Sequence, residues 1–159
     1  MKRRGCVLLW GGLTVAVMVM IFWFSAQPAV DSDQTSGKLI RLLLAFFRPD
    51  FSRMNEAEQA ELILAWQLPI RKLAHFSEYF LLGLFSRMLL EEFELRYKFW
   101  IGWGFGTLYA VTDELHQLAV EMRAPSPVDV GIDSAGVLCG IFVAMFFLWF
   151  FSRKARQPD

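Results

Sequence analysis

The chain has 159 residues, of which 55% are hydrophobic, 16% are aromatic and 20% are charged, and its formal net charge is zero. Soluble domains are usually about 45–50% apolar and about 25% charged, so the mean hydropathy of +0.38 is high. This composition excludes a disordered chain and a nucleic-acid-binding protein that depends on bulk positive charge, and it points to the lipid bilayer.

Four segments are predicted to span a membrane, because about 20 mostly apolar residues cross about 30 Å of hydrocarbon. The first, residues 6–24, contains no charge, and its length and the poor cleavage site after it predict an uncleaved anchor. The second, 69–90, is interrupted by charged residues, whereas 99–120 and 128–151 each have one polar end. We therefore predict an all-α fold, in which residues 1–159 form one integral membrane bundle of four transmembrane helices.

The distribution of lysine and arginine predicts that both termini are cytoplasmic. Segments 1–5, 91–98 and 152–159 would lie inside and hold eight such residues, whereas the longer outer segments 25–68 and 121–127 hold five. The inner eight are Lys2, Arg3, Arg4, Arg96, Lys98, Arg153, Lys154 and Arg156, and the outer five are Lys38, Arg41, Arg48, Arg53 and Arg123. Since cytoplasmic loops are enriched in these residues, we expect an integral protein of the plasma or inner membrane with this orientation.

The first outer connection, 25–68, is predicted to contain amphipathic helices that lie in the membrane interface. Lys38, Arg41 and Arg48 share one helical face opposite leucine, isoleucine and phenylalanine. Helices of this kind place their cations near lipid phosphates and their apolar side chains among acyl chains. Pro49 is expected to end this helix.

A second helix is predicted in the same connection, from Asn55 to Leu68. Asn55 is a suitable N-cap, and Glu58 three residues later completes a capping box. Pro69 then fits the first turn of the following span. The interfacial helices would either cover the bundle as a lid or control the access of a lipid-like ligand, and both interpretations stay open.

Polar and ionisable residues recur inside the other three spans, although an ionised group at mid-bilayer costs at least about 2.5–3.5 kcal/mol and normally faces another polar group. Their spacing of three and four residues places them on one face of each helix. They are Lys72, His75, Glu78 and Tyr79, then Asp113, Glu114 and Gln117, then Asp129 and Asp133. Because successive spans alternate in direction, all three groups are predicted to meet at the outer face.

Arg123 lies in the short outer connection between the third and fourth spans. Pro125 and Pro127 would stiffen this connection and hold Arg123 over the polar groups. Its planar guanidinium is well shaped for a phosphate or a carboxylate.

Two pairs of glycines four residues apart predict that helices approach each other closely. They are Gly102 with Gly106 in the third span and Gly136 with Gly140 in the fourth.

Taken together, these motifs resemble the VanZ-like membrane protein family, named after a protein associated with resistance to teicoplanin. The matching pieces are Phe24-Ser25-Ala26-Gln27-Pro28, Lys72-x-x-His75-x-x-x-Tyr79, Asp113-Glu114-x-x-Gln117, Arg123, Ser126 and Asp129-x-x-x-Asp133-x-x-Gly136. The resemblance covers roughly residues 20–140 and implies a fold and a cell-envelope context rather than a reaction. Ala26 stands where the family often has a second serine. In the family a proline and a glycine usually precede the arginine, whereas here Ala124 and Pro125 follow Arg123.

The function that we favour from the sequence is binding of membrane lipids or another lipid-like amphiphile in the outer-leaflet half, in cell-envelope maintenance or teicoplanin-type glycopeptide resistance. Lys72 and Arg123 would contact an anionic headgroup, and Gln27, Tyr79 and Gln117 would donate hydrogen bonds. The full set of predicted binding residues is Gln27, Lys72, His75, Tyr79, Asp113, Glu114, Gln117, Arg123, Asp129 and Asp133.

An alternative is a membrane-embedded hydrolase or transferase that acts on a lipid-linked substrate. His75 would then be the general base, oriented by Glu78 or Asp113. Asp129 and Asp133 are the predicted ligands of a divalent cation. The sequence contains no H-E-x-x-H motif, no nucleophile elbow and no phosphatase-type signature, so it leaves open whether the protein is an enzyme.

A third interpretation is a scaffold, in which Lys72 and Arg123 neutralise the acidic residues and pin the bundle together. The sequence indicates no cofactor and no nucleic-acid partner, and it does not indicate the oligomeric state.

Overall fold

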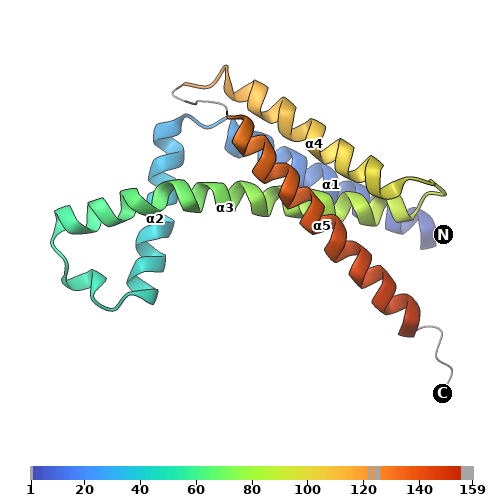
Figure 1. Ribbon diagram of the computed structural model, residues 1–159, viewed down its shortest axis with the longest axis horizontal. Helices are drawn as coiled ribbons and strands as arrows, with labels where there is room; N and C mark the ends of the chain where they lie inside the picture. Colours follow the sequence, from blue (N-terminus) through green and yellow to red (C-terminus); the bar gives the residue numbers. More distant parts are fainter. Residues whose placement is uncertain (1, 122, 124–125, 155–159) are drawn as a thin grey trace.

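The computed structural model describes residues 2–121, 123 and 126–154, which are almost entirely helical (Figure 1). The elements are α1 (Lys2–Ser25), α2 (Ala29–Phe47), the short 3-10 helix η1 (Phe51–Arg53), α3 (Glu56–Glu91), α4 (Lys98–Gln117) and α5 (Pro127–Lys154). No strand occurs among the described residues, so the predicted all-α class is confirmed. Ala124, Pro125 and Arg156, which were used in the sequence analysis, lie outside the described residues.

The predicted helix 55–68 and the predicted span 69–90 form one continuous helix, α3. The Asn55 side chain accepts a hydrogen bond from the Glu58 backbone N–H at 2.9 Å, and the Glu58 carboxylate accepts one from the Asn55 N–H at 3.0 Å. The predicted capping box is therefore confirmed. The prediction that Pro69 begins a new helix was wrong, because good helix formers on both sides carry α3 through this proline.

α2 begins at Ala29 rather than at Lys38, and it ends at Phe47, just before Pro49 as predicted. It crosses α3 steeply (Figure 1), and a Cβ atom on Gly37 of α2 would lie 3.8 Å from Ile63 and 3.9 Å from Gln67 of α3. The side chain of Ile40 is buried at this crossing, and Arg71 of α3 forms an ion pair with Asp33 of α2. α2 is thus attached to α3 by both apolar packing and charge.

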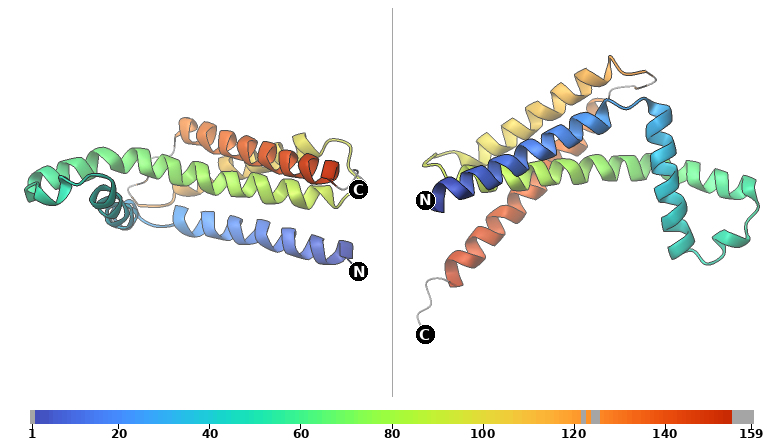
Figure 2. Two further views of the ribbon diagram at one scale, coloured as in Figure 1. Left: turned by 90° about the horizontal axis from the view of Figure 1, so that it is seen from below. Right: turned by 180° about the vertical axis from the view of Figure 1, so that it is seen from behind.

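α3 is the central helix of the bundle and packs against α1, α2, α4 and α5. It lies between α1 and α5 when the bundle is seen from below (Figure 2). At one end Arg3 of α1 donates to the Glu92 carbonyl, just after α3. At the other end Arg123 donates to the Gln27 carbonyl, just after α1. Successive long helices therefore alternate in direction, as the sequence analysis assumed.

The crossing of α3 and α5 is built on glycines. A Cβ atom on Gly140 would lie 2.0 Å from the Phe80 carbonyl oxygen, and one on Gly136 would lie 2.5 Å from the Phe76 carbonyl oxygen. On the α3 side, a Cβ on Gly83 would lie 2.2 Å from the Val137 carbonyl oxygen. The pair Gly136 and Gly140 therefore brings two backbones into direct contact, as predicted.

Two of the described helices are long and apolar enough to cross a membrane, namely Arg3–Ser25 of α1 and Pro127–Arg153 of α5. Their apolar side chains are largely exposed, including Leu8 at 77% and Trp23 at 69%. Large exposed apolar surfaces are rare on soluble proteins and ordinary on proteins surrounded by lipid. α3 and α4 carry more polar residues, so the four-span arrangement stays a prediction.

We predict that Gly140→Ala destabilises the bundle by about 1–3 kcal/mol, because overpacking a close contact forces the helices apart. The measurement is the unfolding of the purified protein in detergent. Gly131→Ala is the matched control in the same helix, since a Cβ there has no neighbour within 4 Å. Equal stability of the two variants would contradict the glycine-based crossing.

Candidate functional site

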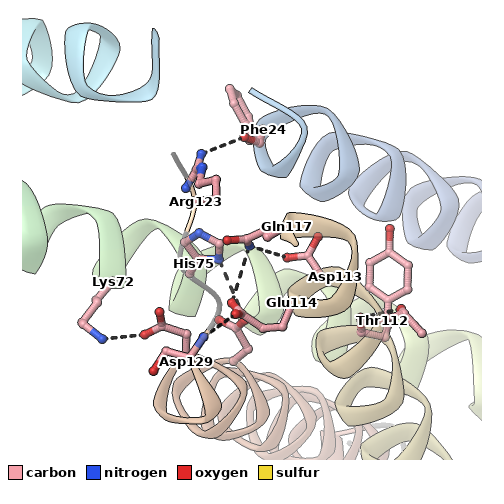
Figure 3. Close-up of polar contacts among 12 residues, drawn as sticks. Phe24, Lys72, His75, Thr112, Asp113, Glu114, Gln117, Arg123 and Asp129 are labelled. Atoms are coloured by element: carbon pink, nitrogen blue, oxygen red, sulfur yellow. Dashed lines mark hydrogen bonds and ion pairs between the residues drawn. The ribbon is translucent and has the colours of Figure 1, made fainter. Parts of the chain in front are cut away.

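The polar groups predicted on three separate spans meet at one end of the bundle (Figure 3). His75 of α3, Asp113 of α4 and Asp133 of α5 each offer one potential ligand atom, and these atoms lie within 4.8 Å of one another. Asp133 is 0% exposed and Asp113 is 4% exposed. The prediction that alternating helix directions bring these residues together is confirmed. We call these three residues the central cluster.

Hydrogen bonding in the central cluster is incomplete. Both carboxylate oxygens of Asp133 and the Nδ1 atom of His75 are buried without a hydrogen-bond partner among the described residues. The nearest approach between the two side chains is 3.8 Å, from His75 Nδ1 to Asp133 Oδ2. The buried Tyr79 hydroxyl also has no such partner. Each unsatisfied buried polar group lowers the stability of the fold by about 1–3 kcal/mol. The buried polar atoms of the cluster are therefore free to bind a further group.

The surrounding polar residues are better satisfied. Glu114 accepts a hydrogen bond from the Ser126 N–H at 2.8 Å, just before α5. The Gln117 amide nitrogen lies 3.5 Å from oxygens of both Asp113 and Glu114 (Figure 3). The Glu114 hydrogen bond connects the end of α4 to the residue just before α5, whereas the Gln117 contacts lie within α4.

Lys72 and Arg123, the two predicted headgroup cations, are engaged in different ways. Lys72 forms an ion pair with Asp129 at 2.5 Å. Arg123 donates to the carbonyl oxygens of Phe24 at 3.4 Å and Gln27 at 3.2 Å, at the end of α1. Of the ion pairs that the scaffold interpretation proposed, the structure describes Lys72 with Asp129.

A cavity of about 240 Å³ opens beside the central cluster, between α1, α2 and α3. Gln27, His75 and Arg123 line it, together with Glu78. The other predicted binding residues, Lys72, Tyr79, Asp113, Glu114, Gln117, Asp129 and Asp133, are not part of its lining. His75 therefore belongs to both the cavity and the central cluster.

An apolar groove of about 220 Å³ adjoins this cavity between α2 and α3. Its walls consist of apolar side chains, namely Ile40, Leu43, Leu44, Phe47, Trp66 and Ile70. Ile70 lines both spaces, so the cavity and the apolar groove meet at this residue.

Arg71 is a charged cavity residue that was not predicted from the sequence as part of the site. It was read only as a charge that interrupts a span, whereas the structure places it in the cavity wall and in the ion pair with Asp33. Its spacing of four and seven residues from His75 and Glu78 puts all three on one helical face, and this was the available signal. The Asp33 partner has no such signal, because the pair depends on how α2 crosses α3.

We predict that Lys72 and Asp129 are energetically coupled by about 0.5–3 kcal/mol, as residues in direct contact usually are. The measurement is a double-mutant cycle of Lys72→Met and Asp129→Asn by unfolding in detergent. The control cycle combines Lys72→Met with Asp50→Asn, because Asp50 pairs with Arg48 at the far end of α2. Additive effects in the first cycle would show that the ion pair does not hold α3 to α5.

One comparison with known proteins identifies the family of the chain. The family model for VanZ/LLP1 matches residues 10–149, which include every predicted site residue. No curated protein and no solved structure matches the chain. The resemblance noted from the short motifs is thereby confirmed, and it agrees with the two apolar helices α1 and α5. The chain is a membrane protein that belongs to the VanZ/LLP1 family.

Proposed function

We propose that the cavity between α1, α2 and α3 binds the anionic headgroup of a membrane amphiphile, whose acyl chain occupies the adjoining apolar groove. The observation that carries this proposal is that a cavity with charged side chains in its wall and a groove with only apolar walls meet at Ile70. An amphiphile has the same two parts in the same order. A soluble polar ligand has no apolar part that would bind in the groove.

The two arginines in the cavity wall support an anionic headgroup. Burial and the like charge of Arg71 lower the pKa of Arg123, although an arginine stays protonated at neutral pH. Arg71 pairs with Asp33, yet its Nε is buried without a hydrogen-bond partner among the described residues. A phosphate or carboxylate between the two guanidinium groups would relieve their repulsion and accept the unused hydrogen bond.

We further propose that α1, α3, α4 and α5 all cross the membrane, with the cavity in the outer leaflet and both termini in the cytoplasm. Trp100, Leu108 and Leu115 support a membrane location for α4, because these exposed side chains form one stripe along the helix. α2 would then lie in the interface. Its exposed Leu42 and Phe46 lie next to Lys38 and Arg41 around the helix, which suits contact with acyl chains and phosphates.

The family's association with teicoplanin resistance makes a lipoglycopeptide a second amphiphile to test beside phospholipids. Either ligand would give the protein a role in maintaining the cell envelope. The two share one chemistry, an anionic or polar head joined to an apolar chain, and a titration with each distinguishes them.

One observation favours a second function, that of a membrane-embedded hydrolase or transferase. His75 lines the cavity and lies next to Asp133, so it is placed between a bound headgroup and a carboxylate. It would act as a general base toward a lipid-linked substrate. Turnover of lipid phosphates by the purified protein, lost in His75→Gln, is the result that this function requires.

We predict that Arg71→Gln weakens the binding of phosphatidylglycerol by about tenfold or more, because a charge-assisted hydrogen bond contributes about 1.5–3 kcal/mol. Native mass spectrometry of the detergent-solubilised protein measures this against phosphatidylcholine. Arg53→Gln on η1 is the control, because Arg53 does not line the cavity. If phosphatidylglycerol binds both variants equally, the headgroup site is wrong.

We also predict that Leu44→Trp fills the groove and weakens the binding of long-chain phosphatidylglycerol more than that of a short-chain homologue. Leu42→Trp is the matched control, since Leu42 is on the same helix but faces away from the groove. Equal loss for both chain lengths would mean that the acyl chain lies elsewhere.

A further inference from the structure

The two carboxylates of the central cluster have His75 as their one described ion-pair partner, at 3.8 Å from Asp133. Asp133 is fully buried, and neither of its oxygens has a hydrogen-bond partner among the described residues. Asp113 is also buried, and its hydrogen bond from Gln117 comes from an uncharged amide. Two carboxylates in such a place require a counter-charge or protons, because burying an unpaired charge is strongly unfavourable.

The nearby cations do not supply this counter-charge through direct contacts. Lys72 forms an ion pair with Asp129, and Arg71 forms one with Asp33. The described hydrogen bonds of Arg123 go to backbone carbonyl oxygens at the end of α1.

We propose that His75, Asp113 and Asp133 bind one divalent transition-metal cation, Zn²⁺ or Mn²⁺. The charges balance, since two carboxylates and a neutral imidazole carry the two negative charges that such a cation cancels. This site is separate from the headgroup contacts proposed above, although His75 lines the same cavity.

The geometry and the ligand types fit such a cation. Ligand atoms at about 2.0–2.2 Å from one metal ion lie within about 4.4 Å of one another. The three candidate atoms already lie within 4.8 Å, so small side-chain rotations complete the group. One imidazole nitrogen with two carboxylate oxygens is a set that suits Zn²⁺ and Mn²⁺ rather than a soft cation. Three protein ligands also leave a coordination position for water or a ligand oxygen.

A fourth side chain supports the site from outside. The Tyr79 hydroxyl is fully buried without a hydrogen-bond partner among the described residues. It lies close enough to Asp113 and Asp133 to interact electrostatically with both. Hydroxyl groups commonly donate to carboxylates that ligate a metal, and they fix the orientation of those carboxylates.

The structure places other potential metal ligands beside Asp133 than the sequence predicted. The sequence paired it with Asp129, one helical turn earlier in the same span. In the structure Asp129 faces Lys72, and His75 and Asp113 from two other helices lie beside Asp133 instead. A cation here would therefore join three helices rather than bind to one.

The first test is the metal content of the full-length protein, purified without a histidine tag or chelator and measured by inductively coupled plasma mass spectrometry. We expect one equivalent of Zn²⁺ or Mn²⁺ per chain, lost in His75→Ala and in Asp133→Asn. His116→Ala and Asp129→Asn are matched controls on α4 and α5 that should retain it, since neither residue belongs to the central cluster. Retention of the metal in both cluster variants would overturn the proposal.

The second test uses the wild-type protein alone, so it decides the matter even if the cluster variants fail to fold. Treatment with a chelator should lower the thermal unfolding temperature, and added Zn²⁺ or Mn²⁺ should restore it. A metal-free wild-type protein whose unfolding temperature does not respond to either cation would show that protons neutralise the carboxylates instead. A wild-type protein that contains the metal but does not bind phosphatidylglycerol would count against the headgroup site and leave this one standing.

Discussion

Direct backbone contact between α3 and α5 is the constraint on which the rest of the structure depends. Gly136 and Gly140 allow α5 to approach the carbonyl groups of Phe76 and Phe80. Asp133 and His75 lie immediately before these contacts along their helices, so the crossing sets their two side chains against each other. Dispersion forces and helix packing, rather than a hydrophobic driving force, hold such a crossing together in lipid.

The crossing also explains why the polar residues are tolerated. α4 adds Asp113 from a third direction, so Asp113 and Asp133 are both buried among the helices. His75 and Arg71 of α3 line the cavity, and the apolar groove between α2 and α3 adjoins it. Along α3, the central cluster, the cavity and the apolar groove therefore lie next to one another. This arrangement is what a membrane amphiphile, with a head and a chain, would match.

Local signals in the sequence were sufficient for most helix boundaries and for bringing the polar groups together, but not for the continuity of α3 through Pro69 or the start of α2 at Ala29. The capping box at Asn55, the glycine pair Gly136 and Gly140, and the meeting of three polar faces all follow from spacing and chain direction. The path of α2 could not be obtained in this way. It depends on the pairing of Asp33 with Arg71 across two helices, and the cavity exists only because of that crossing. The exact neighbours of Asp133 likewise depend on helix rotation, which periodicity does not specify.

The most direct test of the account is an experimental density map of the protein in lipid nanodiscs that contain phosphatidylglycerol. The account predicts that the side chains of His75, Asp113 and Asp133 converge around density for a cation, with headgroup density between Arg71 and Arg123. Side chains that point apart, toward acyl chains or bulk water, would contradict it and leave only an anchored helical bundle.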